Sequence, residues 1–336
     1  NLGLIDNTAF TKHLIHGKDS TDFLNWFTCN KLPKISKINL TYALTEKGTI
    51  RSEYTIIRIE KEKYYLISSG AWQAYDGDFL EKSIESKSHI YKDLKCVDVT
   101  SMKGVFSIAG PKARIFLQKA IGKNFDRDFF SNKKFPWLST KEIEIGMCPV
   151  TAIRVSYTGE LGWELHHPIE MQNYLFDLLE KLGEEFDLQF VGARAQNWLR
   201  MEKSYAAFGN ELASDVTPIE AGLERFIDKS KNFKGKDQLL NKKSNIMCVT
   251  LLISDTIDKD PWGREAIFLD GKRVGRLTSG GYSTFFKKSI GMGYVDLKYC
   301  KVGTKLEIKI LNELYNATIV ENSPYDPNNE KVRKDF

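Results

Sequence analysis

The first hundred residues alternate hydrophobic and polar side chains over short stretches, which is typical of half-buried strands. Residues 4–16 are expected to form one strand, followed by a turn at 17–20 and a helix over about 21–28. Strands are predicted next at 42–44, 49–59 and 64–68, and they form an antiparallel meander. Large apolar residues at helical spacing predict a helix over 72–86.

The middle of the chain mixes both periodicities. In order, the pattern predicts a strand at 104–110, a helix at 111–121, a strand at 150–155, a turn at 157–160, a strand at 163–166, and helices at 169–182 and 193–206. Gly159 and Gly162 supply the permissive backbone that a tight reversal needs. The two strands around this reversal therefore predict a β-hairpin.

The last third is β-rich. Short helices are expected at 218–227 and 233–241, and strand patterning begins near Ile246 and ends near Val320. Two turns, Asp270-Gly271 and Asn312-Glu313, predict hairpins within it. This region fits a small antiparallel barrel or sandwich, and the polar tail at 322–336 is expected to be poorly ordered.

Length and composition indicate an ordinary globular protein. The 336 residues predict two or three domains, and 42% hydrophobic with 28% charged residues is near the average for such proteins. No long apolar run predicts a membrane span, and no signal peptide opens the chain. Because residue 1 is Asn, we expect a processed product or a fragment.

Charge and cysteine content narrow the class further. The net charge of +5 comes from scattered lysines, which does not support nucleic-acid binding but would suit an anionic small ligand. Five cysteines without a Cys-x-x-Cys pair indicate a reducing compartment, the cytoplasm or, in a eukaryote, the mitochondrial matrix. The five histidines have no metal-site spacing, so no metal is expected.

Four blocks in order carry a family resemblance. They are Tyr157-Thr-Gly-Glu-Leu-Gly-Trp-Glu164, Gly192-Ala-Arg-Ala-Gln-Asn-Trp-Leu-Arg-Met-Glu202, Thr217-Pro-Ile-Glu-Ala-Gly222, and the pair Val274–Gly280 with Lys288–Val295. Together they resemble the glycine-cleavage T-proteins, the tetrahydrofolate-dependent aminomethyltransferases, and within that group the folate-binding half of dimethylglycine and sarcosine dehydrogenases. The resemblance implies an α+β, three-domain fold: two mixed α/β domains and a C-terminal antiparallel β-barrel.

The resemblance also implies domain bounds. A folate-binding domain is expected at 1–97, a second domain carrying the hairpin at 98–212, and the barrel domain at 213–336. The family usually has a segment before the position that matches Leu4. We therefore expect the domain around 98–212 to take a strand or helix from upstream sequence, or to be frayed.

The same matching assigns site residues. Glu53 stands where the family has the second Asp of Gly-Gly-x-x-Asp-Asp, and it is the catalytic candidate because a carboxylate can take a proton and stabilise a cationic iminium. Glu164 matches the glutamate that binds the pterin edge. A carboxylate can accept two parallel hydrogen bonds from the N–H donors of that edge. The matched folate contacts are Tyr54, Thr55, Tyr157, Glu164, His166 and Arg194, with Tyr205 as a weaker candidate.

Structural explanations compete with several of these roles. Glu53 alone would be an ordinary solvent-facing strand residue. Glu202 faces the apolar side of its helix and is expected to pair with Arg200 or Arg194. Arg194 itself fits an ion pair and a ligand clamp equally well.

Three functions follow from the resemblance. The first is a one-carbon transferase that takes a methylene group from an N-methylated amine and yields 5,10-methylenetetrahydrofolate. The second is a stand-alone folate-dependent demethylase or glycine-cleavage aminomethyltransferase, and the third is a non-enzymatic folate-binding assembly factor for iron–sulfur proteins. Because the chain contains no Gly-x-Gly-x-x-Gly and no Walker loop, FAD is expected only on an upstream domain or a partner flavoprotein.

Overall fold

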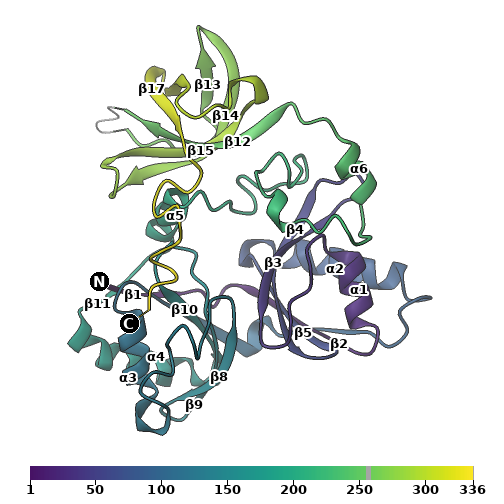
Figure 1. The fold of residues 1–336 in the computed structure, drawn as a ribbon, viewed down its shortest axis with the longest axis vertical. Helices are drawn as coiled ribbons and strands as arrows, with labels where there is room; N and C mark the ends of the chain where they lie inside the picture. Colours follow the sequence, from purple (N-terminus) through teal and green to yellow (C-terminus); the bar gives the residue numbers. More distant parts are fainter. Residues whose placement is uncertain (255–258, 336) are drawn as a thin grey trace.

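The computed structural model describes residues 1–254 and 259–335, which form three parts (Figure 1). Two sheets with helices lie next to each other, and a barrel stands above them with the helix α5(Ala193–Glu202) beneath it. Single 3-10 turns cover Gly70–Trp72, Thr100–Met102, Gly122–Asn124, Ile169–Met171, Glu184–Phe186, Glu224–Phe226 and Leu297–Tyr299. No helix in these described ranges is long and apolar enough to cross a membrane.

The first sheet contains the predicted meander. Its order is β3-β4-β5-β2-β6, with β2(Thr11–His16), β3(Ile38–Leu44), β4(Ile50–Glu60), β5(Lys63–Ser68) and β6(Lys95–Asp98). The helices α1(Ser20–Phe27) and α2(Gln73–Ser86) pack on one face, where Phe23 and Leu80 meet Tyr54 in the core. The meander and both helices are confirmed.

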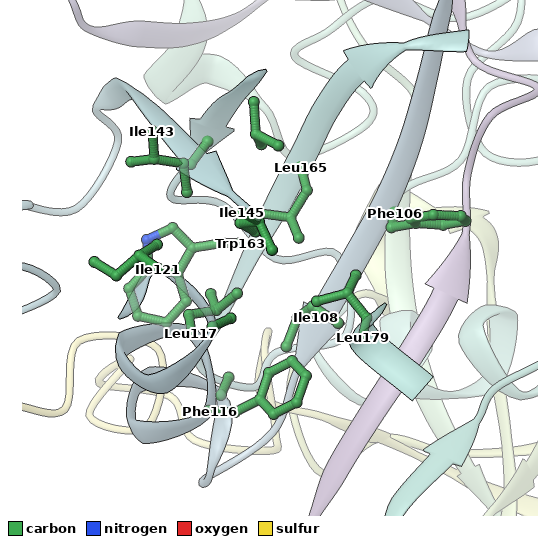
Figure 2. Packing of buried hydrophobic residues seen from close by; sticks show 14 of the residues in the cluster. Phe106, Ile108, Phe116, Leu117, Ile121, Ile143, Ile145, Trp163, Leu165 and Leu179 are labelled. Carbon is green, nitrogen blue, oxygen red and sulfur yellow. The ribbon is translucent and has the colours of Figure 1, made fainter. Parts of the chain in front are cut away.

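The second sheet has the order β11-β1-β7-β10-β9-β8. Its strands are β1(Leu2–Asp6), β7(Lys103–Ala109), β8(Thr140–Ile145), β9(Cys148–Ile153), β10(Gly162–Pro168) and β11(Leu188–Phe190), and its helices are α3(Ala113–Ala120) and α4(Gln172–Gly183). Figure 2 shows its core, in which Trp163 and Leu165 of β10 lie near Leu117 of α3.

The single strand predicted at 4–16 is wrong. The chain forms β1 and β2 in different sheets, and the Asp6 carboxylate accepts a hydrogen bond from the backbone N–H of Thr8 at 2.9 Å, which turns the chain between them. The opening residues of the expected 1–97 domain therefore lie in the second sheet. There β1 pairs with both β7 and β11, so this sheet takes a strand from upstream of residue 98.

The helix predicted at 193–206 is too long. It ends at Glu202, because Ser204 adopts a left-handed backbone with φ 53°, which an α-helix cannot continue. Tyr205 and Ala206 therefore follow the helix instead of lying on its face. Farther on, only α6(Lys236–Asn241) and the 3-10 turn Glu224–Phe226 form where helices were expected at 233–241 and 218–227.

The C-terminal part is a closed barrel, as predicted. Its strands are β12(Ile246–Ile253), β13(Ala266–Leu269), β14(Lys272–Ser283), β15(Lys288–Asp296), β16(Lys305–Ile310) and β17(Glu313–Val320), in the order β12-β15-β14-β13-β16-β17. The tail at 322–335 is packed rather than poorly ordered, with Tyr325 and Val332 buried, while Phe336 lies outside the described residues.

Candidate functional site

The hairpin of β9 and β10 places two polar side chains on one face of the second sheet. Antiparallel pairing joins Glu164 to Ile153, and the turn before β10 contains Gly159 with φ 81°, a value that glycine adopts without strain. Because successive side chains of a strand alternate, Trp163 enters the core while Glu164 and His166 lie on the opposite face. The predicted hairpin is confirmed.

A hydrogen-bond chain joins the two sheets at this face. The Tyr65 hydroxyl of β5 lies 3.1 Å from His166 Nδ1, and His166 Nε2 lies 3.2 Å from Glu164 Oε2. Burial lowers the pKa of His166, so its ring is neutral, and the arrangement assigns the proton to Nε2, which donates to Glu164. His166 thus orients the Glu164 carboxylate from inside the protein.

Two stacked tyrosines lie beside the hairpin turn. The rings of Tyr157 and Tyr205 are 6.1 Å apart with 17° between their planes. The Tyr157 hydroxyl donates to the backbone oxygen of Ala206 at 3.1 Å. Burial raises the pKa of both phenols, so neither ionises near neutral pH. A cavity of about 10 Å³, room for one water molecule, lies against Tyr157, Glu164 and Gln196.

Glu53 lies on β4, directly across the ladder from Tyr42 of β3. Burial raises the pKa of Glu53 to about 7, while the Tyr42 hydroxyl and the Arg200 guanidinium act in the opposite direction. The Glu53 carboxylate in turn helps to raise the pKa of Tyr157. The first sheet, the hairpin and α5 therefore place Glu53, Tyr157 and Arg200 within electrostatic range of one another.

A buried ion pair beside these residues was not predicted. Arg200 donates from Nη1 to Glu211 Oε2 and from Nη2 to Ser279 Oγ, each at 2.6 Å, and Thr278 Oγ1 donates to Glu211 Oε1 at 2.7 Å. Both ionic side chains are fully buried. The arginine was noticed in the sequence as a buried-pair candidate, but nothing in the local pattern indicated Glu211.

The pairing expected for Glu202 is wrong. Its carboxylate accepts a hydrogen bond from Ser283 Oγ of β14 at 2.5 Å instead of pairing with Arg200 or Arg194. A hydroxyl from the barrel reaches this buried position, while Arg200 points to Glu211. Glu202 therefore connects α5 to the barrel.

The remaining predicted contacts divide into two groups. Thr55 shares the Glu53 side of β4 by strand alternation, whereas Tyr54 points to the other face and packs against Phe27 with ring centroids 5.9 Å apart. Arg194, the second residue of α5, has its side chain 64% exposed and 3.6 Å from the Asp260 carboxylate. The structure thus does not bring Tyr54 to the Glu53 group, and it places Arg194 at the surface beside the barrel.

Comparison with known families agrees with this architecture. Residues 1–231 match the GCVT N-terminal domain, and residues 247–326 match the glycine cleavage T-protein C-terminal barrel domain. The chain belongs to the glycine cleavage T-protein family. The resemblance read from the four sequence blocks and the three-part fold are both confirmed.

Relatives of two kinds are similar to this T-protein family member. A mitochondrial dimethylglycine dehydrogenase of Rattus norvegicus is 35% identical over 99% of this chain, which spans only 39% of that relative's length. An aminomethyltransferase of Caldanaerobacter subterraneus is 30% identical over 98% of the chain and 86% of its own length. The crystal structure of aminomethyltransferase T from Bartonella henselae shares the fold, with a TM-score of 0.84 at 22% identity over 100% of this chain and 88% of that one.

Proposed function

We propose that this chain is a tetrahydrofolate-dependent one-carbon transferase. The carbon comes from an iminium derived from an N-methylated amine of the dimethylglycine or sarcosine type. It bonds to two folate nitrogens, the demethylated amine leaves, one proton is released, and 5,10-methylenetetrahydrofolate is the product. The observation that carries the proposal is the Glu164 carboxylate, which His166 holds beside Tyr157 at the family's pterin-binding position.

The residues around Glu164 fit the edge of a pterin. The side chain is only 12% exposed, and of its two oxygens Oε2 meets His166, while the described residues give Oε1 no hydrogen-bond partner. A buried carboxylate gains most from a ligand that brings N–H donors to it, as the amide and amino edge of a pterin does. Tyr157 supplies an aromatic wall for such a ring.

Glu53 is the proposed proton acceptor. With a pKa near 7 it can take up and release a proton at neutral pH, and its ionised form would stabilise a neighbouring cation. Thr55, on the same face of β4, is a proposed folate contact, and the exposed Arg194 is proposed to meet the anionic end of the folate. Tyr205 supports Tyr157 by stacking.

The amine must be oxidised before its carbon is transferred. We assign that step to a flavin on an upstream domain or on a partner flavoprotein, because the curated dehydrogenases extend far beyond the region that this chain matches. A second candidate function is the aminomethyltransferase reaction itself, favoured by relatives that this chain covers to 86%. The proposed compartment is the cytoplasm, or the mitochondrial matrix in a eukaryote.

The function is tested by folate binding to Glu164→Gln. This change keeps the shape of the side chain but replaces one acceptor oxygen by a donor that opposes the pterin N–H groups. Calorimetry should show the Kd for tetrahydrofolate raised by roughly 10- to 100-fold. Glu142→Gln on the exposed edge strand β8 is the matched control and should bind as the wild type does. Equal affinity in both variants would reject this site.

A further inference from the structure

The last described residues do not end at the barrel. Residues 321–335, called here the C-terminal segment, leave β17 and run past α5 to the second sheet, where they end near α3 (Figure 1). Tyr325 is 7% exposed and Val332 is fully buried, so the segment is anchored by two buried side chains, while most of the residues around them are exposed.

The segment is held first at the end of α5. Ser323 Oγ donates to the backbone oxygen of Lys203 at 2.6 Å, and the backbone N–H of Tyr325 donates to that of Glu202 at 3.0 Å. In return Lys203 Nζ donates to the backbone oxygen of Asp326 at 2.6 Å and to Asn329 Oδ1 at 2.9 Å. Both of these acceptors, the only ones that the described residues offer this ammonium group, belong to the C-terminal segment.

The segment is held again at its far end. Arg154 Nη2 donates to the backbone oxygen of Val332 at 3.4 Å, and Asn132 donates to the backbone oxygen of Arg333 at 2.7 Å. The backbone N–H of Asn132 also reaches Asp335 Oδ1 at 2.9 Å. Asn132 lies in the connection between α3 and β8, and Arg154 begins the connection between β9 and β10.

Lys203 connects the segment to the site. Its methylenes lie so close to Gly159 that a Cβ at that glycine would stand 2.3 Å from Lys203 Cγ. Its ammonium lies 6.0 Å from the ring centroid of Tyr205, which stacks on Tyr157. The segment contacts the same turn a second time, because the Tyr325 hydroxyl donates to the Glu160 carboxylate.

The buried charge of Lys203 couples its hydrogen bonds to the C-terminal segment with its packing on Gly159. Lys203 is 1% exposed, and burial lowers its pKa, so its charge is retained only with acceptors around it. If the C-terminal segment detached, the ammonium would have to turn toward water, and its methylenes would leave Gly159. The turn that carries Tyr157 would then lose the surface on which it packs.

We propose that Lys203 is a positioning residue: bound by the C-terminal segment, it holds the Tyr157–Glu160 turn and Tyr205 in the geometry that receives folate. The inference rests on the proposed function. It adds that an element more than 150 residues downstream of Tyr157 in the chain, attached to the barrel, determines the shape of the folate pocket.

The test uses Lys203→Met, which keeps the packing stem and removes the ammonium. Hydrogen exchange of residues 321–335 should accelerate, and the Kd for tetrahydrofolate should rise by about 10-fold or more. Asn132→Ala is the control, because it loosens only the far end of the segment and should leave the Kd unchanged. Equal changes of Kd in both variants, or none in Lys203→Met, would overturn the proposal.

A double-mutant cycle separates positioning from a general loss of stability. If Lys203 acts through Tyr157, adding Lys203→Met to Tyr157→Ala should weaken folate binding little further, whereas additive losses would contradict the proposal. Tyr325→Phe deletes only the hydroxyl that donates to Glu160, and it should also raise the Kd for tetrahydrofolate. This variant replaces Lys203→Met if Lys203→Met does not fold. An unchanged Kd in Tyr325→Phe would count against the proposal.

A readout without folate keeps the two proposals distinct. In protein labelled with 3-fluorotyrosine, the Tyr157 resonance, assigned by its loss in Tyr157→Phe, should shift in Lys203→Met and stay in place in Asn132→Ala. That result would support positioning even if the wild type did not bind folate, which would reject only the proposed function. An unmoved resonance would reject positioning.

Discussion

At the scale of single residues, Glu53 has the property that a proton acceptor needs. Burial moves its pKa from the ordinary range for a carboxyl group to about 7, and Tyr42 faces it across the ladder. Strand alternation explains why its neighbour Tyr54 has a structural role instead, packed against Phe27 on the other side of β4. One carboxylate and one phenol, adjacent in sequence, thus lie in different environments.

Glu53→Gln should separate catalysis from binding. The amide keeps the shape of the side chain and loses charge and basicity, so we expect the rate of 5,10-methylenetetrahydrofolate formation to fall by roughly 10²-fold or more. Folate affinity should change little, since the proposed contact is to the reacting cation. The measurement is transfer from formaldehyde or the native amine, with the Kd determined in parallel. Equal losses of rate and affinity would make Glu53 a pocket wall.

The same variant should be more stable than the wild type at alkaline pH. The folded-state pKa of Glu53, about 7, lies above its ordinary value of 4.5, so the native state binds more protons between these values and stability falls as pH rises through them. Glu53→Gln escapes this cost, which is at most about 3 kcal/mol. Urea unfolding should give the variant a larger free energy of unfolding than the wild type at pH 8 and an equal one at pH 4. A constant difference at both pH values would argue against burial of the charge.

At the scale of elements, a buried ion pair fastens α5 to the barrel. Arg200 of α5 donates to Glu211 and to Ser279 of β14, and Glu202, also on α5, accepts a hydrogen bond from Ser283 of the same strand. The helix that carries the family's Leu-Arg-Met-Glu block is therefore anchored to the barrel strand β14 by two residues, Arg200 and Glu202.

Removing one charge of this pair should be costly. Glu211→Gln leaves the Arg200 charge buried without its counterion, and we expect a loss of about 3–5 kcal/mol in the free energy of unfolding. Asp215→Asn breaks the exposed pair with Arg276, whose side chain is 51% exposed, and should cost less than about 1 kcal/mol. Chemical denaturation of both variants decides this, and similar losses would mean that Arg200 finds another acceptor.

The sequence predicted the elements whose signals are local. The hairpin before Glu164 and the barrel hairpin at Asp270-Gly271 were predicted because alternation and glycine act over a few residues. The break between β1 and β2 was missed, although the polar run Asp6-Asn7-Thr8 interrupts the alternation there, and only the pairing partners show that two sheets are involved.

Partners distant in sequence could not be predicted. Glu202 meets a hydroxyl 81 positions away, and the helix end at Glu202 reflects the left-handed Ser204, which propensity does not foresee. The site residues came from family resemblance, so their types were known while their environments were not. The core position of Tyr54 depends on packing within the first part, and the surface position of Arg194 depends on how α5 meets the barrel region at Asp260.

At the scale of the whole molecule, two connections join the sheets, and one lysine binds both. In the connection between β1 and β2, Lys12 Nζ donates to the backbone oxygen of Thr8 at 2.8 Å. At the connection between β6 and β7, it donates to the backbone oxygens of Thr100 and Lys103 at 3.1 and 2.6 Å. The residue is fully buried. Its charge therefore lies at the point where the two sheets are linked.

Lys12 should make stability depend on pH in the opposite sense to Glu53. Burial lowers its pKa from 10.5 to about 8, with Asp98 and Asp6 acting against this, so the unfolded chain binds more protons between these values. The cost of the buried charge is present below pH 8 and disappears as pH rises toward 10.5. Relative to Lys12→Met, the wild type should gain at most about 3 kcal/mol between pH 7.5 and 10.

Urea unfolding of wild type and Lys12→Met at both pH values measures this difference. The change in this stability difference with pH excludes contributions from groups that titrate alike in the two proteins. It also excludes the pH-independent cost of the three carbonyl oxygens that lose their donor in Lys12→Met. Lys61→Met, at a side chain 85% exposed, should show no such pH dependence. A flat difference for Lys12 would mean that its ammonium has the pKa of a solvated lysine, and that the three carbonyl oxygens offset its burial completely.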